Sequence, residues 1–437
     1  MQTVSVIGLG KLGSPFLATC ASRGFKVIGL DVNSHFVNLI SQGKAPVYEP
    51  KLADTIKKNK NRITTTTDYN LAIANTDITF VIVPTPSTTN GSFSNKYILS
   101  AAINIAKVLS KKEKFHVIVI VSTVIPTSIN KQIIPLIEKI SGKKVGINFG
   151  VCYNPEFIAL GSVIDNLLNP DIVLIGESDE KSGEIMQKFY RKFLLNKPKI
   201  FKMNIVNAEI AKIALNSFIT TKISFANTLA QICASVPGGD VDKVTEAIGQ
   251  DSRIGQKYFK GGLPFGGPCF PRDNRAFSYF ADKQKVLAPL PKATDIVNKN
   301  MHNFLINKII RSTGSGKKVS IIGLAYKNNT DVVEESEGIK IANILSAKGY
   351  KVSVWDPIAL NNAKKYLSSQ IKISKSLKSC VSDCDILAIM TPWDSFKNIK
   401  TSLLKRKYKK LILLDCWNIL DKVKYQNIAN YITIGKP

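Results

Sequence analysis

The chain has 437 residues, of which 44% are hydrophobic, so it can bury several cores of the usual domain size. Its 60 lysines and arginines outnumber its 32 acidic residues and give a net charge of +28 at pH 7. No run reaches the roughly 18 consecutive apolar residues of a membrane-spanning helix, and no secretory leader is visible. A multidomain cytoplasmic protein without a membrane segment is therefore predicted.

The positive charge raises the question of a polyanionic partner, because basic surfaces often bind nucleic acid. The densest lysine runs, at residues 57–62 and 405–410, have the composition of solvated faces, and no recognised nucleic-acid-binding module accompanies them. We interpret the excess mainly as compositional bias, so nucleic acid is not the expected partner. A basic surface would still attract a small anionic substrate.

Seven cysteines are scattered along the chain without the paired spacing of a zinc site or a disulfide framework. They are Cys20, Cys152, Cys233, Cys269, Cys380, Cys384 and Cys416. This usage is typical of reduced thiols in the cytoplasm, and at least one thiol could be chemically available. The three histidines also lack metal-ligand spacing, so no metal site is predicted.

The first expected element is an apolar strand that ends in the turn Gly8-Leu-Gly-Lys-Leu-Gly13. Gly8 permits the tight bend, Gly10 lets the backbone approach a pyrophosphate, and Gly13 allows close packing of a helix whose N-terminus favours the anion. A second strand ends at Asp31, whose carboxylate can bind a ribose and would repel a 2′-phosphate. This pattern predicts an NAD site, and the alternative is a glycine-rich turn without a ligand.

Further along, apolar runs at residues 78–83, 117–121 and 172–175 alternate with helix-compatible stretches, which predicts a largely parallel sheet. Residues 206–234 contain neither glycine nor proline and should form one long helix that ends at Pro237-Gly-Gly239.

The opening pattern then returns, because Val319–Ala325 and Lys348–Asp356 again read as a strand, a glycine turn and a strand ending in aspartate. The second turn, Gly323-Leu-Ala-Tyr-Lys327, lacks the later glycines and carries a lysine, which suits either another phosphate-bearing ligand or a purely structural turn. Apolar runs at 386–390 and 411–414 complete the second sheet. The predicted fold class is α/β, with two Rossmann-like doubly wound domains joined by a central helical domain.

The expected boundaries are residues 1–200 for the NAD-binding domain, 201–305 for the helical domain and 306–437 for the second Rossmann-like domain. Within the helical domain, residues 253–273 are rich in glycine and proline and should form a shaped loop that lies against a ligand. Cys269 lies in this loop and is a candidate nucleophile. The competing interpretation is an inert core cysteine.

The chain resembles the UDP-glucose/GDP-mannose dehydrogenase family from Val4 through the third domain. The resemblance rests on the order and spacing of short motifs: 8–13, Val47-Tyr-Glu-Pro50, Val83-Pro-Thr-Pro86, Ser122-Thr-Val124, Asn154-Pro-Glu-Phe157, Asn207–Lys212 with Asn216, Gly266–Asp273 and Gly323–Asp331. It implies oxidation of the C6 alcohol of a nucleotide sugar to the uronate by NAD, in two steps.

The resemblance also implies roles for individual residues. Cys269 matches the catalytic cysteine that carries a thiohemiacetal and a thioester, and Lys212 and Asn216 match the oxyanion-stabilising pair. Asp273, Glu156 and Thr123 match the family's groups that position the hydrolytic water and support proton transfer. Cofactor contacts match Gly8, Gly10, Leu12, Gly13, Asp31, Thr85, Thr123 and Arg272. Substrate contacts match Glu156, Phe157, Lys212, Asn216, Arg253, Tyr258, Lys260, Gly262, Gly266 and Lys327.

The reaction independently requires these residue types, because removal of hydride from an alcohol develops an alkoxide that a cation and an amide donor stabilise. Lys212 and Asn216 are four residues apart and should share one face of the long helix. Judged alone, Lys212 could be a solvated lysine, Asp273 an N-cap and Glu156 a salt-bridge partner in a loop.

Four positions depart from the family pattern. Glu334 stands where a cofactor-contacting arginine is usual, Phe36 replaces a frequent basic residue after Asp31, Leu160 replaces a frequent glutamate, and Trp417 stands where a basic residue is common. Loss of cations should weaken binding to a pyrophosphate. We expect these departures to bear on the NAD affinity and on the identity of the sugar.

UDP-glucose is the favoured substrate, with UDP-N-acetylmannosamine, UDP-N-acetylglucosamine and GDP-mannose as alternatives. Two other functions compete with this one. A two-electron β-hydroxyacid-type dehydrogenase would use a similar helix lysine and asparagine, and a noncatalytic descendant would bind polyanions. The long central helix and Arg253, which in the family reaches a neighbouring subunit's substrate, predict at least a homodimer.

Overall fold

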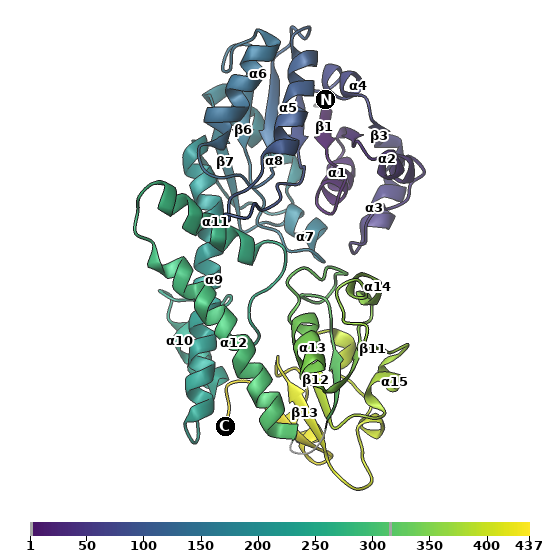
Figure 1. The fold of residues 1–437 in the computed structure, drawn as a ribbon. Helices are drawn as coiled ribbons and strands as arrows, with labels where there is room; N and C mark the ends of the chain where they lie inside the picture. The colour runs from purple at the N-terminus through teal and green to yellow at the C-terminus, as the bar shows by residue number, and fades with distance from the viewer. Residues whose placement is uncertain (1–2, 314–316) are drawn as a thin grey trace. The chain divides into compact units, whose positions relative to one another are not determined.

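A computed structural model describes residues 3–313 and 317–437, and the chain divides into two compact units at Ala214 (Figure 1). Each unit has a β-sheet of its own, with two hydrophobic core clusters in the first unit and one in the second among the described residues. None of the helices within these residues combines the length and apolarity needed to cross a lipid bilayer.

The described part of the first unit contains an eight-stranded sheet in the order β3-β2-β1-β4-β5-β6-β7-β8. All neighbouring strands are parallel except β6 and β7. The strands are β1 (Thr3–Ile7), β2 (Lys26–Leu30), β3 (Ile63–Thr66), β4 (Ile78–Val81), β5 (His116–Ile120), β6 (Phe149–Tyr153), β7 (Ile172–Glu177) and β8 (Lys199–Asn204). The predicted parallel sheet is therefore confirmed, with one antiparallel exception.

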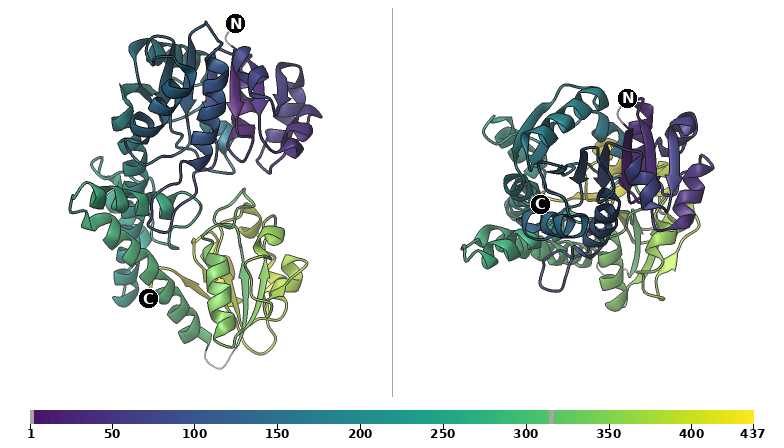
Figure 2. Two further views of the ribbon diagram at one scale, coloured as in Figure 1. Left: turned by 45° about the horizontal axis from the view of Figure 1, so that its top comes forward. Right: turned by 90° about the horizontal axis from the view of Figure 1, so that it is seen from above.

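Strand β5 is apolar without alternation from Val117 to Ile120, after the buried His116. Val117 and Val119 belong to one core, whereas Ile118 and Ile120 belong to the other. Successive side chains of a strand point to opposite faces, so a sheet covered on both faces needs apolar residues at every position. Figures 1 and 2 show the helices that provide this cover. They are α1 (Gly13–Ser22), α2 (Ser34–Ser41), α3 (Leu52–Lys58), α4 (Tyr69–Ala74), α5 (Lys96–Leu109), α6 (Ile134–Ser141), α7 (Val163–Leu168) and α8 (Glu180–Phe193).

Helix α9 (Ile205–Ser235) begins in the first unit and continues into the second. Its bounds confirm the long helix predicted over residues 206–234. It is followed by α10 (Val241–Gln250), α11 (Phe270–Lys283) and α12 (Pro289–Thr313). The glycine- and proline-rich stretch between α10 and α11 forms no helix or strand, as its composition predicts.

The second unit also contains a parallel sheet, with strand order β11-β10-β9-β12-β13-β14 within the described residues. Its strands are β9 (Lys318–Ile322), β10 (Lys351–Trp355), β11 (Lys372–Ile373), β12 (Ile386–Ile389), β13 (Leu411–Asp415) and β14 (Ala429–Thr433). The helices that follow β9 along the chain are α13 (Glu337–Ala347), α14 (Leu360–Ala363), α15 (Leu377–Val381) and α16 (Lys422–Gln426). The order of β10, β9 and β12 repeats that of β2, β1 and β4, which confirms two Rossmann-like folds.

Candidate active site

The glycine turn after β1 has the geometry that a dinucleotide needs. Gly8 has a φ of +94°, and a Cβ atom there would overlap the carbonyl oxygen of Ile82. A Cβ atom on Gly13 would overlap the carbonyl oxygen of Gly8, so α1 packs directly on the turn. At Gly10, by contrast, a Cβ atom would meet nothing within 4 Å. Open space above Gly10, at the N-terminus of α1, fits a pyrophosphate.

Asp31 lies at the end of β2 and faces this turn. Its carboxylate accepts hydrogen bonds from the backbone N–H groups of Leu9, at 2.6 Å, and Asn33, at 2.8 Å. The residue is partly exposed, and a carboxylate has about four acceptor sites, so acceptor capacity remains for a ribose. The residues of this turn therefore fit NAD.

In the turn after β9, an aspartate at the end of the next strand again accepts hydrogen bonds from the turn backbone, but here the contact is structural. Asp356 accepts hydrogen bonds from the backbone of Leu324, at 2.7 Å, and Ala325, at 3.1 Å, and it is fully buried. The backbone of Ile358 and Ala359 and the indole of Trp393 also donate to it, so little capacity is left for a ligand.

The second turn lacks the closely spaced later glycines, as the sequence shows, but a distant glycine packs against it. Gly338, at the start of α13, plays the part of Gly13, because a Cβ atom there would overlap the carbonyl oxygen of Gly323. The intervening loop lengthens the spacing from five residues to fifteen and hides the motif in the sequence.

Lys212 on α9 is buried and donates a hydrogen bond from Nζ to the carbonyl oxygen of Glu156, at 2.7 Å. The ammonium group also lies 4.8 Å from the centre of the Phe157 ring. These contacts exclude a solvated surface lysine. Burial raises the pKa of Glu156 to about 7, and the charge of Lys212 opposes this rise. At neutral pH, Glu156 can therefore accept or hold a proton.

Tyr190 on α8 also contacts this group and was not predicted from the sequence. Its buried hydroxyl donates to Asn154 Oδ1 at 2.5 Å and lies 3.4 Å from Glu156 Oε1. The amide of Asn154 donates in turn to the carbonyl oxygen of Leu174, at 2.7 Å. Tyr190 lies in an ordinary amphipathic helix, where no local motif distinguishes it.

Cys269 is the N-cap residue of α11 and is exposed, whereas the other six cysteines are buried. Burial raises the pKa of Cys20, Cys152 and Cys416, which makes these thiols poor nucleophiles. At Cys269, the positive end of the helix dipole favours a negative charge.

One turn into α11, Asp273 forms a buried contact with α9. The side-chain amide of Asn216 donates to Asp273 Oδ2 at 2.6 Å, and Arg272 Nε lies 3.5 Å from Oδ1. Oδ1 is buried and accepts no hydrogen bond among the described residues, which leaves it able to bind a water molecule. Asp273 is not an N-cap, since Cys269 occupies that position. The Asn216 amide keeps a second N–H for another acceptor.

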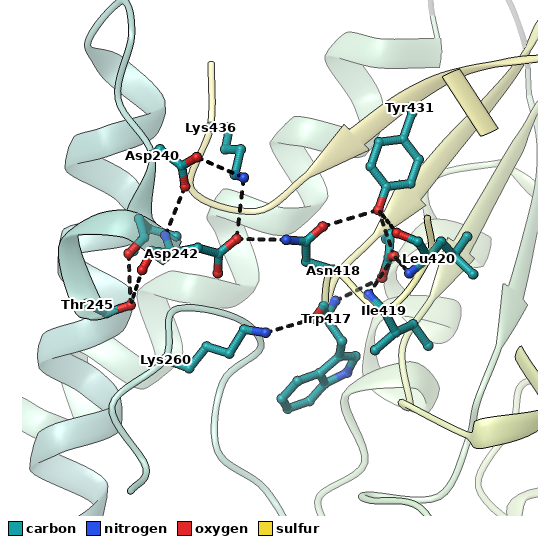
Figure 3. A network of polar contacts seen from close by, with 12 residues as sticks. Asp240, Asp242, Thr245, Lys260, Trp417, Asn418, Ile419, Leu420, Tyr431 and Lys436 are labelled. Carbon is teal, nitrogen blue, oxygen red and sulfur yellow. Dashed lines mark hydrogen bonds and ion pairs between the residues drawn. The ribbon is translucent and has the colours of Figure 1, made fainter. Parts of the chain in front are cut away.

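The loop before Cys269 packs against the C-terminal sheet domain of the same unit. The N–H of Gly267 donates to the carbonyl oxygen of Glu334 at 3.2 Å. A Cβ atom on Gly266 would overlap the carbonyl oxygen of Glu335. Lys260 Nζ donates to the carbonyl oxygen of Trp417 at 3.3 Å (Figure 3).

Figure 3 also shows how this domain is tied to α10. Asn418 donates to Asp242 at 2.8 Å, and Lys436 forms an ion pair with Asp240 at 3.0 Å. The loop that holds Lys260 is thus supported by contacts around the end of β13.

The remaining predicted residues occupy varied positions. In the first unit Leu12 is the N-cap of α1, Thr85 is buried and Thr123 is half-buried after β5. In the second unit Tyr258 is exposed with a φ of +62°, and Arg253 is exposed and forms a 2.6 Å ion pair with Asp251. A Cβ atom on Gly262 would lie 3.6 Å from the carbonyl oxygen of Cys416. Lys327 is half-buried in the loop after β9.

A glycine turn and an adjacent acid that fit a dinucleotide, on a doubly wound sheet, are typical of a dinucleotide-binding protein. The chain belongs to the UDP-glucose/GDP-mannose dehydrogenase family. The family's NAD binding domain matches residues 2–194, its central domain matches 206–300 and its UDP binding domain matches 320–422. The protein is thus an NAD-dependent nucleotide-sugar 6-dehydrogenase.

Relatives cover nearly the whole chain. The UDP-glucose 6-dehydrogenase TuaD of Bacillus subtilis is 33% identical over 443 aligned residues, covering 100% of this chain and 94% of its own. The GDP-mannose 6-dehydrogenase of Pseudomonas aeruginosa is 34% identical over 87% of this chain and 88% of its own. Among solved structures, a UDP-glucose dehydrogenase from Pyrobaculum islandicum has a TM-score of 0.90 and 30% identity, covering 100% of this chain and 98% of that one.

Proposed function

We propose that this protein oxidises the C6 hydroxyl of UDP-glucose to the carboxylate in two steps, through a thiohemiacetal and a thioester on Cys269. The observation that carries the proposal is the exposed Cys269 thiol at the N-terminus of α11, one turn from the buried Asp273–Asn216 contact. A dehydrogenase that stops at the aldehyde needs no such thiol. Bound NAD supplies the acceptor for the hydride that leaves C6 in each oxidation.

In the first oxidation, the C6 hydroxyl loses its proton as the C6–H bond breaks. Glu156 suits the acceptance of this proton, because its raised pKa of about 7 lies near the working pH. The positive charge of Lys212 stabilises the alkoxide that develops on O6. The buried ammonium has already lost its water, so it needs little reorganisation during the reaction.

In the second oxidation, the thiolate of Cys269 adds to the aldehyde carbon and forms a C–S bond, leaving a negative charge on O6. The second N–H of the Asn216 amide and the Lys212 ammonium are the proposed donors to that oxygen. Loss of hydride gives the thioester, and water then attacks its carbonyl carbon and releases the thiol and the uronate. Asp273, with its unsatisfied Oδ1, is the group proposed to orient this water.

Full-length alignment and structural similarity are the two observations that support UDP-glucose as the substrate. The chain aligns fully with UDP-glucose 6-dehydrogenases from Bacillus subtilis at 33% and 30% identity. The TM-score is 0.90 to the UDP-glucose dehydrogenase of Pyrobaculum islandicum and 0.56 to the GDP-mannose dehydrogenase of Pseudomonas aeruginosa, at the same 30% identity. UDP-N-acetylhexosamines and GDP-mannose are the alternatives.

The proposal includes a homodimer and three functional domains with limits at residues 200 and 305. On α9, Phe218, Phe225 and Ile232 follow one another at seven-residue intervals and are 67%, 55% and 53% exposed. A seven-residue apolar repeat places these side chains along one stripe that a second copy of the helix can cover. Reduced cysteines agree with a cytoplasmic location.

The test is the yield of NADH per mole of limiting sugar, over a panel of UDP- and GDP-hexoses, for the native protein, Cys269→Ser and the buried control Cys233→Ser. Two equivalents from UDP-glucose with the native protein and the control, and loss of that yield in Cys269→Ser, support the proposal. One equivalent throughout would replace it with a two-electron dehydrogenase. Two equivalents from another sugar only would correct the substrate.

A further inference from the structure

The first three turns of α9 are fixed tightly to the sheet of the first unit. A Cβ atom on Gly176 of β7 would lie 2.8 Å from Ala208 Cβ and 3.0 Å from Ile205 Cα, so glycine is what permits this close approach. Lys212 then ties the helix to the loop of Glu156 through its 2.7 Å hydrogen bond. The helix therefore has little freedom to shift along the sheet.

Between these two contacts lies Glu209, a fully buried carboxylate with no role in the chemistry described above. Its two oxygens accept hydrogen bonds from separate backbone groups. Oε2 accepts from the N–H of Thr127 at 2.6 Å, and Oε1 accepts from the N–H of Ile129 at 3.1 Å. Glu209 thus supplies acceptors at the entrance to the π-helical turn Ile129–Ile133 and α6, where a helix leaves its first N–H groups without partners.

The backbone that Glu209 holds is strained. Thr127 has a φ of +77°, in the left-handed region that a β-branched residue rarely adopts. Such a conformation costs about 1–3 kcal/mol and persists only where the surroundings impose it. The short bond from the Thr127 N–H to Glu209 is one contact that does so. A second anchor acts on the other side of the loop, where Ser122 Oγ accepts from the Val83 N–H at 3.0 Å and donates to the Val83 carbonyl at 2.7 Å.

Thr123 lies between these anchors, in the loop that leaves the carboxyl end of β5. Ligands of doubly wound sheets bind at this edge. We propose that Glu209 is a positioning residue, which holds the 122–129 loop in the conformation that places Thr123 for cofactor binding and hydride transfer. The inference rests on the cofactor contact that the family resemblance implies for Thr123 and on the proposed dehydrogenase function. Because Glu209 and Lys212 are three residues apart, α9 sets the positions of the Thr123 loop and the Glu156 loop together.

Variants at Glu209 distinguish positioning from simple stability. Glu209→Ala removes both acceptors, whereas the amide of Glu209→Gln offers one oxygen that can accept from Thr127 or Ile129 but not from both. The matched control is Asp179→Asn, because Asp179 is another carboxylate of the first unit that accepts a helix N-terminal N–H, from Ser182 at 2.9 Å, and it touches neither loop. All three variants should lose some thermal stability.

The readouts are amide hydrogen exchange of residues 122–133, the Kd for NAD by calorimetry, and the separate kcat and KM values for NAD and for the sugar. In Glu209→Ala, exchange at Thr127 and Ile129 should accelerate, the Kd for NAD should rise about tenfold and kcat should fall by about 10-fold to 100-fold, since a displacement of about 1 Å can cost that much. The KM for the sugar should stay within about twofold. Glu209→Gln should be intermediate, and Asp179→Asn should change none of these values.

Exchange and NAD affinity do not depend on the sugar, so they test the inference even if UDP-glucose is the wrong substrate. Accelerated exchange with native NAD affinity and native kcat would overturn the positioning role and leave a purely structural cap. Equal losses in Asp179→Asn and Glu209→Ala would overturn it as well, because general destabilisation would then account for both.

Discussion

Alanine substitutions at two glycines of the first turn should separate cofactor binding from folding. In Gly10→Ala the new Cβ atom meets nothing within 4 Å, and Gly10 does not have the positive φ that alanine avoids. The free energy of unfolding should therefore stay within about 0.5 kcal/mol of the native value. If a pyrophosphate occupies that open space, the methyl group displaces it, and the Kd for NAD should rise at least about tenfold, or about 1.4 kcal/mol.

Gly13→Ala should behave in the opposite way. The new Cβ atom overlaps the carbonyl oxygen of Gly8, so α1 must move away from the turn. Overpacking of this kind costs about 1–3 kcal/mol, which lowers the melting temperature by roughly 2–10 °C for a domain of this size.

The assay is thermal unfolding of both variants with and without saturating NAD. A tenfold weaker Kd removes about 1.4 kcal/mol of the stabilisation that the ligand gives. Gly10→Ala should melt like the native protein without NAD and gain less from NAD. Native NAD affinity in Gly10→Ala would refute the placement of the pyrophosphate above Gly10.

Three further outcomes follow. Lys212→Met should lower kcat about 10²-fold to 10³-fold, because the alkoxide loses its stabilising cation. The acid limb of the kcat/KM profile should also move to higher pH, because Lys212 lowers the pKa of Glu156. A pH–rate series in which this limb does not move would contradict the role assigned to Glu156. The pKa of Glu209 is raised from 4.5 to about 7 by burial, so the folded protein keeps a proton that the unfolded chain releases between these values. The free energy of unfolding should therefore fall by about 3 kcal/mol as pH rises from about 4.5 to 7, and urea titrations should show that Glu209→Gln removes this part of the slope. Ile232→Asp should shift the sedimentation of the protein toward a monomer, and an unchanged sedimentation coefficient would exclude α9 from the interface.

The sequence predicts the fold well where local physics decides it. The buried strand β5 is apolar at every position from Val117 to Ile120, and α9 has no residue that breaks a helix before Pro237. The first glycine turn is recognisable because its three glycines are close together. The third glycine of the second turn, Gly338, is missed because a loop separates it from Gly323, and only the packing of α13 on β9 brings the two together.

Within the site, residues whose side chains can react with or bind a ligand are easier to predict from sequence than residues that hold them in place. Cys269 is distinguished by a loop rich in glycine and proline. Tyr190 and Glu209 act through contacts with residues 34 and more than 80 positions away, and a single sequence contains no signal of such pairs. Glu209 lies inside the family motif Asn207–Lys212, but its proposed role depends on the strained backbone at Thr127, which motif spacing does not reveal.

The central claim is that Cys269 carries the sugar as a thioester. The direct measurement is intact-protein and peptide mass spectrometry of Asp273→Asn, quenched in acid after mixing with UDP-glucose and NAD. Slower hydrolysis in this variant should let an acyl-sugar adduct accumulate on the peptide that contains Cys269, and hydroxylamine should remove it. Formation of two NADH per sugar with no adduct, or with an adduct on another residue, would contradict the account.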